Sequence, residues 1–119
     1  MKNSYAYAAA FWTLAILAVS TAPGSTITPV ASKVPFSSVI AHFGEFFIFS
    51  FLVKHAIETE GVNAKRALAL TILISFAYAG ITEILQLYVP GRFFGYNDIL
   101  TNDIGAIAGL GRSIYVLMA

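Results

Sequence analysis

Long apolar stretches alternate with short polar connections along the chain. A helix needs about 20 mostly apolar residues to cross roughly 30 Å of hydrocarbon. The connections carry glycine and proline, which mark turns and interrupt helices. The pattern therefore predicts an all-α membrane protein, a bundle of four transmembrane helices in one domain over residues 1–119, with the helices at about 5–21, 38–57, 67–88 and 99–118.

Composition supports a membrane protein and excludes several other classes. Hydrophobic residues make up 58% of the chain and charged residues 11%, with a mean hydropathy of +0.78. Soluble domains carry roughly a quarter charged residues, and so small a domain could not bury this much apolar surface. The net charge of +1 argues against a nucleic-acid partner, and the absence of cysteine excludes disulfides and thiol chemistry. The lipid bilayer is the expected partner.

The first apolar stretch allows a second interpretation. Lys2 precedes an apolar run that ends in Ser20-Thr21-Ala22, which is similar to a secretory signal with a cleavage site of small residues. We expect a retained first helix, with a cleaved signal and three remaining spans as the alternative.

Basic residues predict the orientation in the membrane. With four crossings, one side receives only Lys33 and Arg92 of the seven basic residues. The other side receives the remaining basic residues, which are Lys2, Lys54, Lys65, Arg66 and Arg112. Loops rich in lysine and arginine stay in the cytoplasm. We therefore expect a multi-pass protein of a bacterial-type plasma membrane with both termini cytoplasmic.

Polar and ionisable residues inside apolar spans are costly and are functional hypotheses by default. Three of the predicted helices carry such residues near their outer ends, at one depth in the membrane. Arg92 lies in the outer connection beside them. The sequence therefore predicts one outward-facing polar pocket, with the binding residues His42, Glu45, Glu83, Gln86, Arg92, Asp98, Asn102 and Asp103.

Several short motifs in this region occur in a known order. They are His42-Phe43 with Glu45, the run from Glu83 to Gln86, Pro90-Gly91-Arg92, and Asp98 with Asn102, Gly105 and Gly109. In this combination the chain resembles the VanZ-like membrane proteins, which are named for an accessory protein of teicoplanin resistance. The resemblance implies a bacterial membrane protein that affects glycopeptide sensitivity. The chain departs from the family at Ser38 and Val39, where an Asp-Lys pair is usual, and at Phe46, where Tyr is common.

Four uses of the pocket stay open at this point. The preferred one is binding of an anionic lipid or glycan head group without chemistry. An enzyme acting on a lipid-linked phosphate is the alternative, with Arg92 holding the phosphate and His42 or a carboxylate as acid and base. Histidine and carboxylates are also ordinary ligands for a divalent cation, so a metal or cofactor stays open. A purely structural network that fixes the packing of the helices is the fourth.

Gly105 and Gly109 form a G-x-x-x-G face, which permits two helices to approach closely. Packing inside one bundle is the preferred interpretation. An oligomer formed through these glycines is the alternative.

Overall fold

The computed structural model describes residues 3–23, 37–92 and 95–119, apart from the side chain of residue 37. The regular elements of these residues are helices: α1 (Ser4–Thr21), α3 (Ser37–Thr59), α4 (Ala64–Gln86), α5 (Tyr96–Gly109) and α6 (Gly111–Met118). The predicted all-α class is confirmed. The predicted connection between the first two apolar stretches lies outside the described residues from 24 to 36, as do residues 93–94 next to Arg92.

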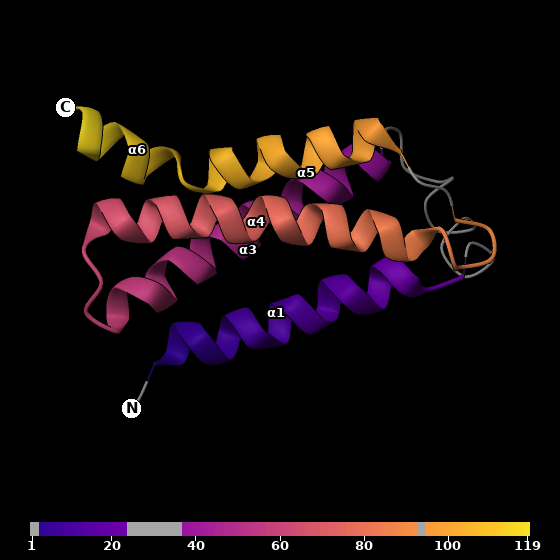
Figure 1. Cartoon of the computed structure of the whole chain (residues 1–119), viewed down its shortest axis with the longest axis horizontal. Coiled ribbons are helices and arrows are strands. Elements are labelled where there is room, and N and C mark those ends of the chain that lie inside the picture. The colour runs from indigo at the N-terminus through magenta and orange to yellow at the C-terminus, as the bar shows by residue number, and fades with distance from the viewer. Residues whose placement is uncertain (1–2, 24–36, 93–94) are drawn as a thin grey trace.

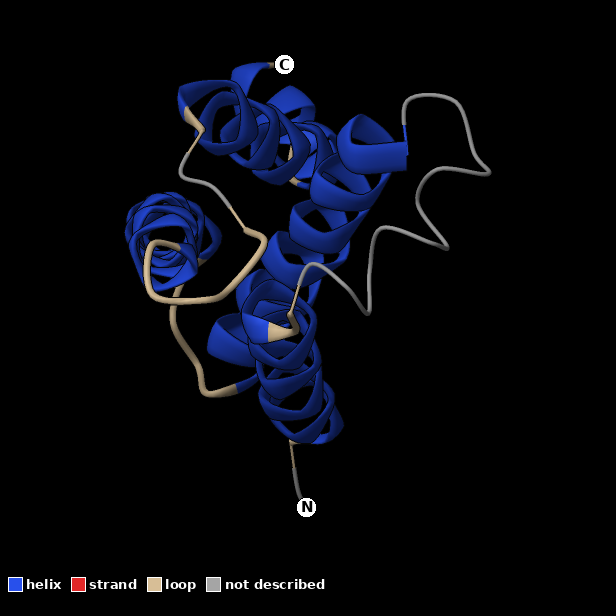
Figure 2. Cartoon of the chain, turned by 90° about the vertical axis from the view of Figure 1, so that its right-hand side faces the viewer, coloured by secondary structure: helices blue, strands red, loops and turns tan. Residues whose placement is uncertain are grey.

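The helices run along the long axis of a bundle that measures 43 × 31 × 23 Å (Figure 1). α3 crosses behind α4, and it contacts α1, α4 and α5. Both ends of the chain lie at one end of the bundle. The start of α3, the end of α4 and the start of α5 lie at the other end, which faces the viewer in Figure 2.

Within the described part of the chain, three helices are long and apolar enough to cross a membrane, at Ser4–Thr21, Ser38–Thr59 and Ala64–Gln86. The predicted fourth helix at 99–118 is wrong as one continuous element. In its place stand α5 with 14 residues and α6 with 8, separated at Leu110, where φ is −101° and ψ is 5°. Gly109 and Gly111 flank the break, and glycine weakens a helix by about 1 kcal/mol relative to alanine.

The packing between the helices is more polar than the outside of the bundle. α4 buries small and polar residues, including Thr71, Ser75 and Glu83, whereas its Leu73 is 66% exposed. α1 likewise exposes Phe11 and other large apolar side chains. Water would oppose this arrangement, but lipid favours it, because apolar side chains then face hydrocarbon while polar groups find partners inside. The three apolar helices are thus compatible with a multi-pass membrane protein.

A small apolar core holds α1 against the other helices. Ile16 of α1 packs with Phe46 and Phe49 of α3, Ala79 of α4 and Ala106 of α5. Two hydrogen bonds reinforce this contact. The Trp12 indole donates to the Glu45 carbonyl at 2.9 Å, and the hydroxyl of Tyr78 donates to the Thr13 carbonyl at 2.6 Å.

The backbones of α3 and α5 touch along a glycine seam formed by Gly105 and Gly109. A Cβ added at Gly105 would collide with the carbonyl oxygen of Phe43, and one at Gly109 with that of Phe47. Ser50 also donates from its hydroxyl to the Ala106 carbonyl at 2.8 Å. These two glycines therefore face α3 of their own chain, whereas an oligomer through them stays a prediction.

Candidate functional site

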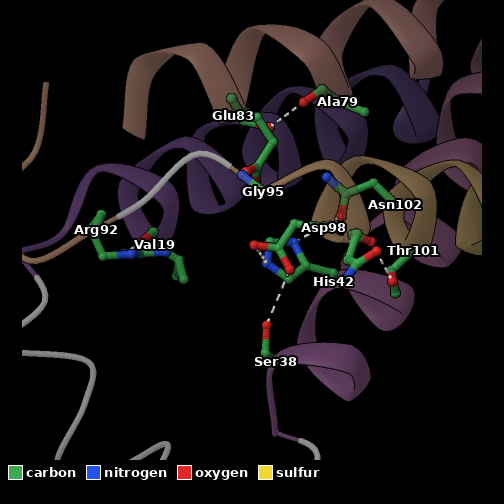
Figure 3. Close-up of polar contacts among 12 residues, drawn as sticks. Val19, Ser38, His42, Ala79, Glu83, Arg92, Gly95, Asp98, Thr101 and Asn102 are labelled. Atoms are coloured by element: carbon green, nitrogen blue, oxygen red, sulfur yellow. Dashed lines mark hydrogen bonds and ion pairs between the residues drawn. The ribbon is translucent and has the colours of Figure 1, made fainter. Parts of the chain in front are cut away.

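Four polar residues meet where α3, α4 and α5 come together, at the end of the bundle opposite both chain termini (Figure 3). We call His42, Glu83, Asp98 and Asn102 the polar cluster. All four belong to the pocket predicted from the sequence. His42 comes from the second turn of α3 and Glu83 from the last turn of α4, while Asp98 and Asn102 lie one turn apart on α5.

The bond between His42 and Asn102 sets the state of the imidazole. Nδ1 of His42 lies 2.8 Å from Oδ1 of Asn102, which is 1% exposed. With the amide oxygen facing the ring, Nδ1 of a neutral imidazole is the donor, while Nδ2 of Asn102 is buried without a hydrogen bond among the described residues. Nε2 is then left with its lone pair as an acceptor or a metal ligand.

Asp98 lies against that second ring nitrogen. Its Oδ2 is 3.6 Å from Nε2 of His42, and its Oδ1 accepts a hydrogen bond from the hydroxyl of Ser38 at 3.4 Å. Ser38 was noted in the sequence only as a departure from the family pattern. Its position four residues before His42 places it on the same face of α3, which could have indicated its role.

Glu83 is the most deeply buried member of the polar cluster, with 0% of its surface exposed. Oε1 accepts a hydrogen bond from the backbone N–H of Gly95 at 3.1 Å. Oε2 is buried and has no hydrogen-bond partner among residues 3–23, 37–92 and 95–119. A buried carboxylate oxygen without a hydrogen-bond partner is energetically unfavourable. Oε2 of Glu83 is therefore a candidate contact for a ligand.

Three members of the polar cluster together form a set of metal-type donors. His42, Glu83 and Asp98 each offer one ligand atom, and these atoms lie within 4.8 Å of one another. They come from three different helices, and Figure 3 shows Glu83 beside Gly95 and Asp98 close to His42.

The other predicted residues are not members of the polar cluster, and each has a different environment. Glu45 interacts electrostatically with His42, Glu83 and Arg92. Gln86 is buried one turn beyond Glu83 on α4. Oδ1 of Asp103 is buried and without a hydrogen bond within the described segments, but Asp103 is not part of the three-residue donor set.

Arg92 has a structural role that the sequence did not predict. Its Nη1 donates to the backbone carbonyl oxygens of Val19 at 2.8 Å and Ala22 at 2.9 Å. These carbonyls belong to the last turn and the C-cap of α1, and the Val19 carbonyl also accepts a hydrogen bond from the backbone N–H of Ala22 at 3.3 Å. A guanidinium also interacts favourably with the negative end of the helix dipole. Arg92 therefore ties the connection between α4 and α5 to the end of α1.

The fold and this site define a class of small all-helical proteins with apolar, membrane-compatible helices around a polar cluster at one end. The sequence model of the VanZ/LLP1 family matches residues 7–118, and the chain belongs to that family. No curated protein and no solved structure matches the chain.

Proposed function

We propose that this protein binds a lipid-linked component of the bacterial cell envelope through the polar cluster, at the outer leaflet of the plasma membrane. The buried Glu83, with one carboxylate oxygen unpartnered in the described structure, carries this proposal. A network that served only to hold the helices together would satisfy such an oxygen internally. The head group of the bound component is a glycan, whose hydroxyls can donate to Oε2 of Glu83, or an anion, which needs a cation between it and this carboxylate. The other proposed binding residues are Glu45, Gln86, Arg92 and Asp103.

The proposal includes a complete membrane topology. α5 and α6 together make the fourth crossing, because helices of 14 and 8 residues span roughly 30 Å at about 1.5 Å per residue. An even number of crossings agrees with both chain ends lying at one end of the bundle. The excess of lysine and arginine then assigns the termini to the cytoplasm and the polar cluster to the outer face.

The test is to identify the lipids that copurify with the protein. Wild type, Glu83→Gln and Glu58→Gln are purified in mild detergent, and their bound lipids are compared by mass spectrometry. Glu58 is the matched control, because it pairs with Lys54 at 3.1 Å at the other end of α3. We expect an enriched lipid-linked species in wild type and in Glu58→Gln that is depleted at least about tenfold in Glu83→Gln, which corresponds to 1.4 kcal/mol of binding free energy. Equal lipid content in all three would contradict the proposal.

Family membership adds a phenotype to this proposal. A bacterium that expresses the wild-type protein is expected to change its sensitivity to a glycopeptide such as teicoplanin, and one that expresses Glu83→Gln to do so less. The control is again Glu58→Gln, at matched expression in the membrane. Identical sensitivity with wild type and with an empty vector would remove this part of the proposal.

A membrane enzyme acting on a lipid-linked phosphate is the second candidate. Nε2 of His42, held as an acceptor beside Asp98, favours it, since a neutral imidazole oriented in this way can serve as a general base. Incubation with envelope lipid extracts would reveal it as a mass-shifted product that wild type forms and His42→Asn does not. Lipid retention without any product would favour binding alone.

A further inference from the structure

We infer that His42, Glu83 and Asp98 bind a divalent transition-metal ion of the Zn²⁺ class. The inference rests on the proposed function for the use of this ion, and it names the cofactor through which an anionic head group is held. The metal site itself depends only on the donor atoms described below.

The donor atoms that remain after hydrogen bonding form the first argument. Asn102 occupies Nδ1 of His42, Ser38 occupies Oδ1 of Asp98, and the N–H of Gly95 occupies Oε1 of Glu83. Each ligand side chain is thus held through one polar atom, as metal ligands usually are by their surrounding hydrogen bonds. The atoms left over are Nε2, Oδ2 and Oε2, and all three carry lone pairs.

Distance is the second argument. Nε2 of His42 and Oδ2 of Asp98 are 3.6 Å apart, which is longer than a hydrogen bond. Two ligands of a tetrahedral Zn²⁺ ion with bonds of about 2.1 Å lie about 3.4 Å apart. One carboxylate oxygen of Glu83 lies within 4.8 Å of the ligand atoms of His42 and Asp98, so a small shift of its side chain suffices for it to join the same ion.

Charge is the third argument. Glu83 and Asp98 repel each other where water is scarce, and Glu45 adds a third carboxylate that interacts with Glu83. His42 and Arg92 both interact favourably with Glu45 and Glu83, but Nη1 of Arg92 is held by the end of α1. An anionic head group would therefore meet an acidic site. A divalent cation reverses this, because it neutralises the carboxylates and attracts the anion.

One imidazole with two carboxylates suits Zn²⁺ and its neighbours better than Ca²⁺ or Mg²⁺, which prefer oxygen ligands throughout. Three protein ligands leave a coordination position open, as in zinc sites that bind water or a substrate. A phosphate oxygen of the lipid-linked component takes this position. The bound ion thereby holds the anion, a role that the guanidinium of Arg92 would otherwise have to fill.

The test uses the metal alone. Protein carrying a tag without histidine is purified in detergent, stripped with a chelator and titrated with Zn²⁺ by calorimetry, with metal content measured by mass spectrometry. We expect one Zn²⁺ per chain, and an affinity more than about 100-fold lower in His42→Asn, Glu83→Gln and Asp98→Asn, since even loss of a supporting hydrogen bond costs 10–100-fold. His55→Asn and Glu58→Gln, at the other end of α3, are matched controls that retain wild-type affinity.

One further variant and a comparison of metal ions make the outcome of this test unambiguous. Ser38→Ala removes only the hydrogen bond to Asp98, so it is expected to fold and to bind Zn²⁺ about tenfold more weakly even where a ligand variant does not fold. Absence of Zn²⁺ binding, or equal binding by wild type and the three ligand variants, would overturn the inference. Binding of Mg²⁺ or Ca²⁺ in preference to Zn²⁺ would overturn it as well.

Lipid analysis of the stripped protein separates this inference from the proposed function. Loss of the copurifying lipid on stripping, with recovery after Zn²⁺ is added, supports both. Lipid that stays bound to protein unable to bind Zn²⁺ overturns the metal site and leaves the proposed function standing. Specific Zn²⁺ binding without any enriched lipid supports the metal site and contradicts the proposed function.

Discussion

Replacing Gly105 by alanine tests the direct contact between α3 and α5. The new methyl group would meet the carbonyl oxygen and Cα of Phe43, which are backbone atoms and cannot rotate away. Overpacking of this kind costs typically 1–3 kcal/mol, partly offset by the gain of about 1 kcal/mol for alanine over glycine in a helix. We therefore expect a net loss of up to about 2 kcal/mol in the free energy of unfolding.

Gly44→Ala provides a matched control in the neighbouring helix. A Cβ at Gly44 has no atom within 4 Å, so the same chemical change is expected to stabilise the protein by about 0.5–1 kcal/mol. Both variants are unfolded by titrating a denaturing detergent into mild-detergent micelles, with helix content followed by circular dichroism. Equal unfolding free energies for Gly105→Ala and Gly44→Ala would refute the claim that the two backbones touch.

Three other predictions concern the polar cluster, the end of α1 and the membrane topology. Asn102→Leu leaves Nδ1 of His42 without its acceptor, so we expect a loss of about 1–3 kcal/mol of stability and a changed tautomer mixture in the nitrogen NMR spectrum of the ring. Arg92→Ala removes the donor from the end of α1, so we expect faster amide hydrogen exchange in the last turn of α1 and unchanged exchange in its first turn. Reporter fusions at the two termini are expected to report the cytoplasm for both.

Each of these predictions has a result that would contradict it. An unchanged tautomer in Asn102→Leu would show that the amide does not set the proton of His42. Exchange in α1 that is identical in wild type and Arg92→Ala would remove the structural role of Arg92. Fusions that report opposite sides would rule out the proposed even number of crossings.

The hydrophobic pattern was sufficient to predict α1, α3 and α4, because each is a long apolar run bounded by turn residues. It failed for the last stretch. Hydropathy averages over a window, so it does not register that Gly109 and Gly111 weaken the helix on both sides of Leu110. The break depends on local backbone energies rather than on total apolarity.

For the candidate site, shared depth along the helices predicted that His42, Glu83, Asp98 and Asn102 lie together. The partners that hold these side chains were harder to infer. The bond from Gly95 to Glu83 depends on the path of a connection between helices, and a backbone N–H carries no signal in the sequence. For Arg92 the sequence left two uses open, a ligand contact in the pocket and an anchor of the loop to lipid phosphates, but which carbonyls it reaches depends on where α1 ends in space.

The glycine seam has a consequence for how a ligand reaches the polar cluster. Gly105 meets Phe43, the residue next to His42, so α3 and α5 are in backbone contact within a turn of the site. These two helices cannot close further, and separating them would break the contact along two turns. The pair of helices α3 and α5, which carries His42, Asp98 and Asn102, is therefore rigid. The Glu83 side chain comes from α4 and accepts a single hydrogen bond, from the backbone N–H of Gly95. We therefore expect that any opening of the polar cluster to the proposed ligand involves movement of α4, and not separation of α3 from α5.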